Sequence, residues 1–332
     1  MKCYKNTCIA FTTYTLSLYL LKMPLDEIQR TFFICNAHIP YSIVRNLPHF
    51  YYFRDNGDQI DRNWKQVFMV RMMKLFRWPF IKLTNIYAQD HQIYASEIIG
   101  HQNYTLMEDG PRCYDIIDKT QGLQPFEYGQ GVTGIKRKFK IFLTKSSMTG
   151  KYFGTNSQCI DRWITCKDDL SSPYIQGKKY TFLNYNELWN NSSEVKNSFI
   201  KSVFGIKDEQ IEALRDADVM IFTQPFMEDC QLTEEEMYKL YADPLKQYPN
   251  AKVIFKPHPR DEFKYDKYFK NCTILKTFAP MQLISLLGIN PKVAITVSST
   301  AMSEMPKSTQ RIYLGTKVHP KIYAVCGDQC NY

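Results

Sequence analysis

Several common features are absent from this sequence of 332 residues, and their absence argues against particular classes of protein or site. No apolar run approaches the roughly 18 residues of a membrane-spanning helix, so we expect no span. No zinc-finger spacing and no arginine-loaded helix is present, so nucleic acid is not an expected partner. Cys326 and Cys330 are close together, but no second cysteine pair lies near them. We therefore predict no metal site.

The composition is that of a globular protein, with 44% hydrophobic and 23% charged residues. It excludes wholesale disorder, and the length is natural for two domains that each bury a core. The net charge of +9 fits an anionic ligand or the anionic inner face of a bacterial membrane. The 10 cysteines are scattered, which predicts reduced, packed thiols and a cytoplasmic protein.

The N-terminal stretch permits two interpretations. Lys2 and Lys5 precede an apolar stretch from Ile9 to Leu21, as in a secretory signal peptide. This stretch has no small-x-small cleavage site, and threonines and a serine interrupt it. The alternative, which we expect, is a first strand from Cys8 to Thr12 that turns directly into a helix from Thr15 to Lys22.

The first half of the chain repeats strand, polar tip and helix, which is typical of a parallel sheet with crossover helices. The predicted strands are Thr31–Cys35, Ile86–Ala88 and Tyr104–Met107. Apolar residues at helical spacing predict a helix from Gln66 to Phe80. Ile39 to Asp55 is predicted to be an aromatic-rich connection, and residues 119–200 an irregular excursion.

A second α/β series begins near Val219. The predicted strands are Val219–Thr223, Val253–Phe255, Thr273–Lys276, Lys292–Val297 and Arg311–Leu314. A capping-box-like start at Thr233 and Glu236 predicts a helix to about Tyr248, and another helix is predicted from Pro280 to Leu287. We therefore predict two α/β domains, residues 1–214 and 215–332.

Three loops with polar side chains follow predicted strands directly. They are Glu108-Asp109-Gly110, Lys256-Pro257-His258-Pro259 and Ser298-Ser299-Thr300. Open α/β sheets bind ligands at the carboxyl ends of their strands, so each loop is a candidate for binding or chemistry. Taken singly, each also has a purely structural interpretation: an acidic turn, a polar turn between prolines, and a helix N-cap.

In this order, the loops resemble the acidic D/E-D/E-G, HP and S-S/T motifs of bacterial sialyltransferases. The resemblance extends in particular to glycosyltransferase family 52, the lipooligosaccharide sialyltransferases. Three further segments carry it: Ile9–Leu16, Thr223–Pro225 and Lys256–Asp261. The individual motifs are short, so the specificity lies in their order and spacing, and the middle third of the chain contributes least.

The resemblance implies an α/β protein with two Rossmann-like domains facing a cleft, the glycosyltransferase B fold. It implies metal-independent, inverting transfer of sialic acid from CMP-sialic acid, without a cofactor. The acceptor would be a terminal sugar such as galactose on a bacterial surface glycan or glycolipid. A homodimer is a further implication. No Asp-x-Asp metal motif stands in a suitable loop, in agreement with a metal-independent reaction.

The resemblance also implies that the second domain holds most of the donor. His258 would protonate or hydrogen-bond the phosphate leaving group, with Lys256 and Pro257 beside it. The hydroxyl and backbone N–H groups of the Ser298, Ser299 and Thr300 loop would bind the phosphate at a helix N-terminus.

Two acidic pairs compete for the role of the base that deprotonates the acceptor hydroxyl. Family members place the base first in the acidic motif, which selects Glu108, with Asp109 orienting it. The rival is Asp229 in the pair Glu228-Asp229, just after Thr223–Pro225. There, Cys230 stands where the motif has glycine.

Further alternatives stay open. A protein of the same fold could use another nucleotide sugar, and a two-domain binding protein could close on an anionic ligand without turnover. The basic run from Lys136 to Lys140 either makes a peripheral contact with the anionic inner membrane or forms a solvated face. Asp90 and His91, at a strand tip, either bind the acceptor or form a plain loop pair.

Overall fold

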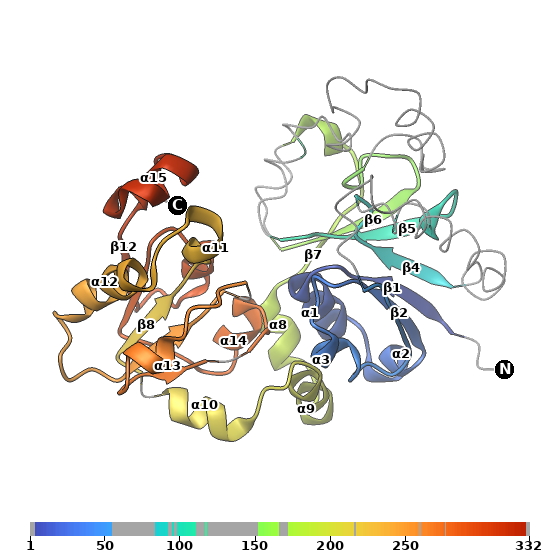
Figure 1. Cartoon of the computed structure of the whole chain (residues 1–332). Helices are drawn as coiled ribbons and strands as arrows, with labels where there is room; N and C mark the ends of the chain where they lie inside the picture. The colour runs from blue at the N-terminus through green and yellow to red at the C-terminus, as the bar shows by residue number, and fades with distance from the viewer. Residues whose placement is uncertain are drawn as a thin grey trace. The chain divides into compact units, whose positions relative to one another are not determined.

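The computed structural model divides the chain into two compact units, residues 1–203 and 204–332 (Figure 1). This division falls earlier in the chain than the boundary expected after residue 214. The structure describes residues 4–54, 84–91, 95, 98–110, 117, 152–165, 172–215, 217–258, 260–275 and 277–329. The predicted helix from Gln66 to Phe80 and the basic run from Lys136 to Lys140 lie outside the described residues.

The first unit contains a parallel sheet with the strand order β3-β2-β1-β4-β5-β6-β7 among the described residues. The strands are β1 (Asn6–Ile9), β2 (Thr31–Cys35), β3 (Phe50–Tyr52), β4 (Asn85–Ala88), β5 (Tyr104–Met107), β6 (Cys159–Ile164) and β7 (Thr181–Phe182). The predicted strands β2 and β5 are confirmed with their bounds, and the prediction for β4 misses one residue. The tips of β4 and β5 are neighbours, which brings the Gln89–His91 and Glu108–Gly110 loops to one edge.

Helix α1 follows β1 directly, as the second interpretation of the N-terminus predicts. Thr12 caps the helix, because its Oγ1 accepts a hydrogen bond from the backbone N–H of Thr15 at 3.1 Å. The strand therefore ends at Ile9, before the predicted Thr12. The helices of this unit are α1 (Thr13–Lys22), α2 (Leu25–Gln29), α3 (Tyr41–Val44), η2 (Pro173–Ile175), α8 (Tyr185–Asn190) and α9 (Glu194–Val203).

Several elements lie where the sequence predicts connections. Strand β3 and helix α3 interrupt the aromatic-rich stretch after Ile39. Elements β6, β7 and α8 lie within residues 119–200, and α9 begins there and ends at Val203. Strand β6 lacks an apolar run because Asp161 and Arg162 stand at its centre. Arg162 is nevertheless only 2% exposed, and its Nη1 donates to the carbonyl oxygen of Phe153 at 2.5 Å. This partner could not be identified from a local pattern.

The second unit contains a parallel sheet with the order β10-β9-β8-β11-β12 among the described residues. Its strands are β8 (Val219–Phe222), β9 (Val253–Lys256), β10 (Thr273–Ile274), β11 (Val293–Thr296) and β12 (Gln310–Tyr313). Its helices are α10 (Asp208–Arg215), α11 (Phe226–Cys230), α12 (Glu234–Leu245), α13 (Tyr265–Tyr268), α14 (Met281–Ser285), η3 (Thr300–Glu304), η4 (Thr316–Val318) and α15 (Pro320–Cys326). Every strand predicted for this half of the chain is present, with small differences in bounds. The capping box of Thr233 and Glu236 is confirmed at the start of α12.

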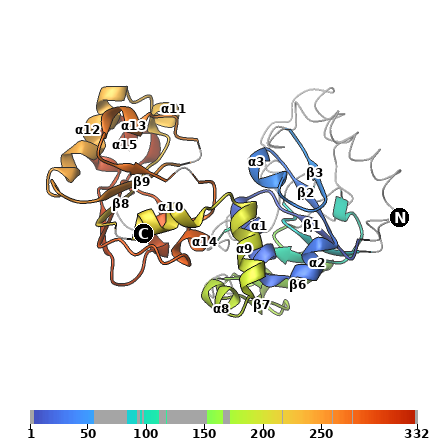
Figure 2. The same cartoon turned by 90° about the horizontal axis from the view of Figure 1, so that it is seen from below.

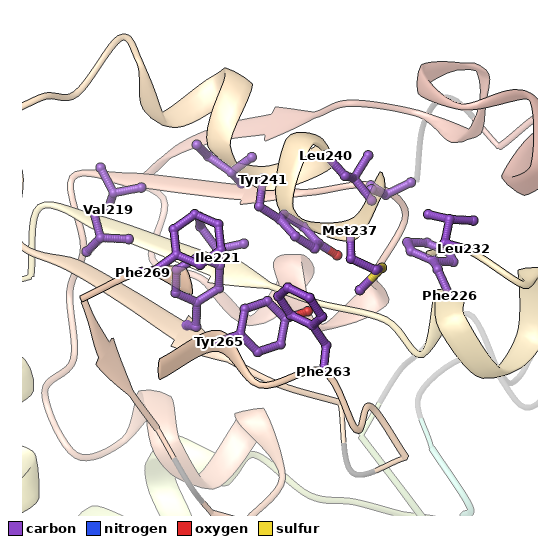
Figure 3. Packing of buried hydrophobic residues seen from close by; sticks show 14 of the residues in the cluster. Val219, Ile221, Phe226, Leu232, Met237, Leu240, Tyr241, Phe263, Tyr265 and Phe269 are labelled. Atoms are coloured by element: carbon purple, nitrogen blue, oxygen red, sulfur yellow. The ribbon is translucent and has the colours of Figure 1, made fainter. Parts of the chain in front are cut away.

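Helices cover both faces of this second sheet. Figure 2 shows α12, α13 and α15 on one side of β8 and β9, and α14 on the other. Apolar side chains of α12 and α13 form one buried cluster with Val219 and Ile221 of β8, and Figure 3 shows Met237, Tyr241 and Tyr265 in this cluster. Near-continuous apolar strands such as Val219–Phe222 are expected when both faces of a parallel sheet are buried.

The register of the second sheet aligns the three loops that follow its central strands. Phe222 of β8 is paired with Lys256 of β9 and with Thr296 of β11. The residues after these three positions therefore leave the sheet at the same level. Because all the strands are parallel, two loops emerge on either side of the Thr223–Pro225 loop. They are the HP loop at the end of β9, Lys256–Asp261, and the Ser298 loop after β11, Ser298–Thr300.

Candidate active site

The HP loop at the tip of β9 presents His258 in a defined orientation. The backbone N–H of His258 donates to Thr223 Oγ1 at 3.3 Å, and the His258 Nδ1 accepts from the backbone N–H of Arg260 at 3.1 Å. Because Nδ1 accepts, the neutral ring carries its proton on Nε2. Pro259 lies outside the described residues, and Pro257 directly precedes the histidine.

The charge state of His258 is set by its surroundings. Partial desolvation of the imidazole, followed by the positive charges of Arg260 and Lys256, lowers the pKa of His258 below its ordinary value. The imidazole is therefore neutral near pH 7 in the absence of a ligand. An anion at this position would favour the cationic form and draw a proton onto the ring.

Asp261 anchors the HP loop to the sheet. Its carboxylate accepts hydrogen bonds from the hydroxyl of Thr223, from the hydroxyl of Tyr265 at 2.8 Å and from the backbone N–H of Phe263 at 3.2 Å. Burial raises the pKa of the Asp261 carboxyl. Thr223 thus contacts both His258 and Asp261, and it fixes the position of the loop relative to β8. The sequence alone did not indicate this role for Thr223, Asp261 or Tyr265.

Arg260 joins the HP loop to α11 by a bidentate ion pair with Asp229. Its Nη1 and Nη2 donate to the two carboxylate oxygens of Asp229 at 2.8 and 2.7 Å. Hydrogen bonds from Arg260 lower the pKa of Asp229, and His258 acts in the same direction when its ring is protonated. The adjacent Glu228 Oε1 accepts from the backbone N–H of Glu262 at 3.0 Å. The rival acidic pair therefore lies against the HP loop.

Lys256 hydrogen-bonds backbone carbonyl groups of two neighbouring loops. Its Nζ donates to the carbonyl oxygen of Thr277 at 3.2 Å and to that of Pro257 at 3.4 Å. Desolvation lowers the pKa of this half-buried lysine to about 8. The side chain thus holds the loops after β9 and β10 together, and it adds positive charge beneath His258.

The Ser298 loop is tied to the Thr223–Pro225 loop through Gln224. The backbone N–H and the hydroxyl of Ser298 both donate to Gln224 Oε1, at 3.2 and 3.0 Å. The Ser299 Oγ accepts from the backbone N–H of Ala301 at 3.3 Å, so Ser299 is the N-cap of η3. The predicted helix is therefore a short 3-10 helix, and Thr300, its first residue, is exposed. The second unit brings the HP loop, Gln224 and Ser298 together.

A cavity of about 410 Å³ opens beside His258 within the second unit. Its lining combines aromatic and aliphatic side chains with polar groups of the HP loop. The lining residues are Pro257, His258, Asp261, Glu262, Phe263, Lys264, Tyr265, Asp266, Ile274, Leu275, Thr277 and Phe278. This volume lies within the range of small-molecule sites, and the mixture of apolar walls and a few polar groups is typical of them.

The acidic loop of the first unit holds a buried carboxylate. Glu108 is 3% exposed, and its Oε1 accepts hydrogen bonds from the hydroxyl of Tyr14 and from both the backbone N–H and the hydroxyl of Thr165, at 2.9 and 2.5 Å. The carbonyl oxygen of Glu108 accepts from the Thr15 hydroxyl at 2.7 Å. Burial, followed by the charge of Glu108, raises the pKa of Tyr14. Glu108 therefore connects the tip of β5 to α1 and to the end of β6.

Asp109 is more accessible than Glu108 and contacts His91. Its Oδ1 accepts from Gln89 Nε2, and its Oδ2 lies 3.5 Å from His91 Nε2. The imidazole of His91 stacks on the ring of Phe153 with the centroids 4.8 Å apart. The structure thus places His91 beside the acidic loop. Acceptor binding by His91 stays a prediction.

The contacts of Asp90 stabilise the fold around the strand tip. It is fully buried, and its carboxylate accepts from the backbone N–H groups of Phe153 and Gly154, both at 2.8 Å, and from the hydroxyl of Tyr104. These contacts connect β4, β5 and the turn before β6. They favour the loop-pair interpretation over direct binding of an acceptor.

Two absences hold for the described part of the chain. No cluster of three or more histidine, cysteine, aspartate or glutamate side chains that could hold a metal ion is found among those residues. No helix built from them is long and apolar enough to cross a membrane.

The sequence model of glycosyltransferase family 52 matches residues 58–322, which is most of the chain. This chain belongs to glycosyltransferase family 52. It is therefore a glycosyltransferase, as the order of the three loops predicts. An uncharacterized protein from Haemophilus influenzae is 28% identical over 245 residues, which cover 74% of this chain and 72% of that protein.

Solved structures show the fold of this family 52 chain. The glycosyltransferase B domain of a sialyltransferase from Photobacterium damselae aligns with a TM-score of 0.60 and 12% identity, covering 92% of this chain and 89% of that one. A UDP-GlcNAc 2-epimerase from Neisseria meningitidis aligns with a TM-score of 0.53 and 12% identity, covering 93% and 82%. The predicted α/β fold of glycosyltransferase B type is confirmed, and the two neighbours show that this fold supports different chemistries.

Proposed function

We propose that this family 52 glycosyltransferase transfers sialic acid from CMP-sialic acid to a terminal sugar, with galactose as the expected acceptor. The observation that carries the proposal is the position of His258, an oriented imidazole beside a cavity of about 410 Å³ at the tips of a parallel sheet. The volume of this cavity is in the range of small-molecule sites, and the Nε2–H of His258 would be the donor for a phosphate bound beside it.

The reaction needs one bond to form and one to break at C2 of the sialic acid. The acceptor oxygen attacks C2, and the bond from C2 to the phosphate oxygen breaks with its electron pair leaving on CMP. His258 stabilises the leaving phosphate by donating a hydrogen bond or a proton from Nε2. The exposed hydroxyl of Thr300 and the half-buried Ser299 would add donors from the tip of β11, on the other side of β8. These groups support departure of the phosphate without a metal ion.

The acceptor proton must pass to a base, and accessibility distinguishes the candidates. Glu108 is 3% exposed and already accepts three hydrogen bonds on one oxygen, so an acceptor hydroxyl would have to displace part of the fold to reach it. The Asp229 side chain is 41% exposed and lies against the HP loop. We therefore assign the base to Asp229 and give Glu108 and Asp109 a positioning role at the tip of β5.

The acceptor and its setting follow from the family resemblance. A bacterial surface glycan or glycolipid is the proposed acceptor, since the resemblance is to lipooligosaccharide sialyltransferases. Peripheral contact with an anionic membrane and a homodimeric state belong to the same proposal. The net charge of +9 supports attraction to an anionic lipid surface.

A second candidate function keeps the fold and changes the nucleotide. The similarity to a UDP-GlcNAc 2-epimerase favours testing UDP-sugars, because the same architecture accepts a uridine nucleotide there. The non-catalytic alternative is set aside, because the chain belongs to an enzyme family.

Thermal denaturation with nucleotides tests the donor directly. A ligand that binds only the native state at 100 times its dissociation constant stabilises that state by about 2.7 kcal/mol. We expect CMP to raise the melting temperature of the protein at concentrations where UDP and cytidine have little effect. A rise with UDP but none with CMP would replace the proposed donor with a uridine-linked sugar.

A further inference from the structure

The guanidinium of Arg260 already binds a carboxylate with its two outer nitrogens, which we call the fork. Both outer nitrogens donate to Asp229, at 2.8 and 2.7 Å, in the two-bond geometry with which arginine recognises planar anions. A lysine could not reproduce this geometry, because its ammonium is a point charge. The contact with Asp229 thus shows that a carboxylate fits this fork.

The pair is exposed and therefore exchangeable. The side chains of Arg260 and Asp229 are 62% and 41% exposed, respectively. Ion pairs at such positions contribute little to stability, because water and salt compete with them. An anion delivered to this position by a tightly held ligand can displace the Asp229 carboxylate without disturbing the core.

Arg260 is also fixed next to His258. Its backbone N–H donates to His258 Nδ1, so the guanidinium and the imidazole start from the same short loop. The proposed donor carries two anionic groups, a phosphodiester and the carboxylate on the carbon that reacts. His258 and the Ser298 loop would bind the phosphodiester. The carboxylate next to the phosphodiester then needs a positively charged partner of its own.

We propose that Arg260 binds the carboxylate of the donor sugar acid, and that Asp229 occupies the guanidinium until the donor displaces it. This inference rests on the proposed function, because the ligand is the carboxylate of CMP-sialic acid. It assigns a subsite that distinguishes an acidic sugar from a neutral one at the same nucleotide site.

The exchange has a consequence for Asp229. The contact with Arg260 lowers the pKa of Asp229, which makes this carboxylate a weaker base. When the donor takes the fork, Asp229 loses that contact and becomes a stronger base. Donor binding would therefore strengthen the base, which couples donor binding to deprotonation of the acceptor.

Isothermal titration at low ionic strength tests the subsite without requiring turnover. The probes are CMP, which has the phosphate alone, and a non-transferable fluorinated analogue of CMP-sialic acid, which has the phosphate and the carboxylate. Arg260→Gln should weaken the analogue about tenfold or more and CMP less than about threefold, since it removes the fork. Arg260→Lys should fall between wild type and Arg260→Gln for the analogue.

Asp229→Asn is the matched variant on the other side of the pair. It keeps the size of the side chain and removes the competing charge, so the analogue should bind about two- to fivefold tighter while CMP is unchanged. Melting temperatures check that each variant is folded, and Arg260→Lys replaces Arg260→Gln if the latter does not fold.

Each result of these titrations either supports the inference or overturns it. Equal weakening of both probes by Arg260→Gln would make Arg260 a phosphate contact and overturn the inference. Weaker analogue binding by Asp229→Asn would overturn the exchange, because Asp229 would then support the loop rather than compete. If wild-type protein binds neither probe, the proposed donor fails and the inference with it.

Discussion

Two acidic residues, Glu108 at the tip of β5 in the first unit and Asp229 on α11 in the second, differ in how the fold uses them. Glu108 is 3% exposed and fastens β5 to α1 and β6 through Tyr14 and Thr165. The Asp229 side chain is 41% exposed and has the arginine of the HP loop as its partner. A buried carboxylate that accepts several hydrogen bonds, such as Glu108, stabilises the fold. An exposed carboxylate in an exchangeable ion pair, such as Asp229, is available to react with a ligand.

The two positions also differ in what surrounds them. Tyr14 lies in the first turn of a nearly fully buried helix, so Glu108 cannot turn outward without breaking a buried contact. Asp229 lies on the five-residue α11, which follows β8 after the Thr223–Pro225 loop, and it contacts Arg260 beside His258. The family motif selects Glu108, and the accessibility of the carboxylates selects Asp229.

Exchanging each carboxylate for its amide tests this comparison most severely. Asp229→Asn should lower the turnover number about 10²–10⁴-fold, the range for a well-placed general base. Glu108→Gln should retain most of the turnover and lower the free energy of unfolding by about 1–3 kcal/mol, because one buried charged hydrogen-bond acceptor is lost. Initial rates and denaturant melts measure both. An inactive Glu108→Gln beside an active Asp229→Asn would return the base to the first unit.

His258→Ala should have the next largest effect, about 10²-fold on the turnover number. The loss stays at the low end of the range because the hydroxyls of the Ser298 loop still meet the phosphate. The fold should survive, since His258 is exposed. His101→Ala, at another exposed histidine, is the control and should behave as wild type. Turnover of His258→Ala close to that of wild type would remove His258 from the mechanism.

The pH dependence of donor binding should report on His258. Its pKa is depressed in the free protein, and a bound phosphodiester raises that pKa, so binding takes up a proton. Affinity for the non-transferable analogue should therefore rise as the pH falls from 8 toward the pKa of His258 in the free protein. If the bound phosphodiester raises this pKa by about one pH unit, the rise should reach about fivefold at the pKa of the free protein, and about tenfold only well below it. Titrations of wild type and His258→Gln measure the difference, and a profile that the variant leaves unchanged would contradict the assignment.

Asp109→Asn should have the smallest effect. Asparagine can still accept the hydrogen bond from Gln89, and only the charge facing His91 is lost. Because a part-exposed ion pair contributes about 1 kcal/mol or less, the turnover number should fall no more than about fivefold. A loss larger than that of Asp229→Asn would show that the acidic loop of the first unit supplies the base after all.

The sequence predicts the elements whose signals are local. The strand β9 is predicted from the short apolar run Val253–Phe255, and the capping box of Thr233 and Glu236 lies within one turn. The positions of the HP and Ser298 loops follow from the rule that parallel strands end at one edge. These local signals are enough to place His258 at a strand tip.

The partners of the site residues could not be predicted in the same way. Tyr14 and Thr165 are 94 and 57 positions away from Glu108 in the chain, and no local pattern connects them. A glutamate beside an aspartate also has the composition of an exposed turn, so its burial is visible only in the folded chain. The ion pair of Arg260 with Asp229 spans 31 positions, and no local pattern predicts it either.

The central claim is tested most directly by offering the protein CMP-sialic acid with a panel of galactosides and neutral controls, followed by mass spectrometry of the products. The account predicts that a galactoside gains the mass of one sialyl residue, that CMP is released in equal amount, and that Asp229→Asn and His258→Ala sharply reduce the gain. Transfer from a UDP-sugar with CMP-sialic acid left intact would contradict it.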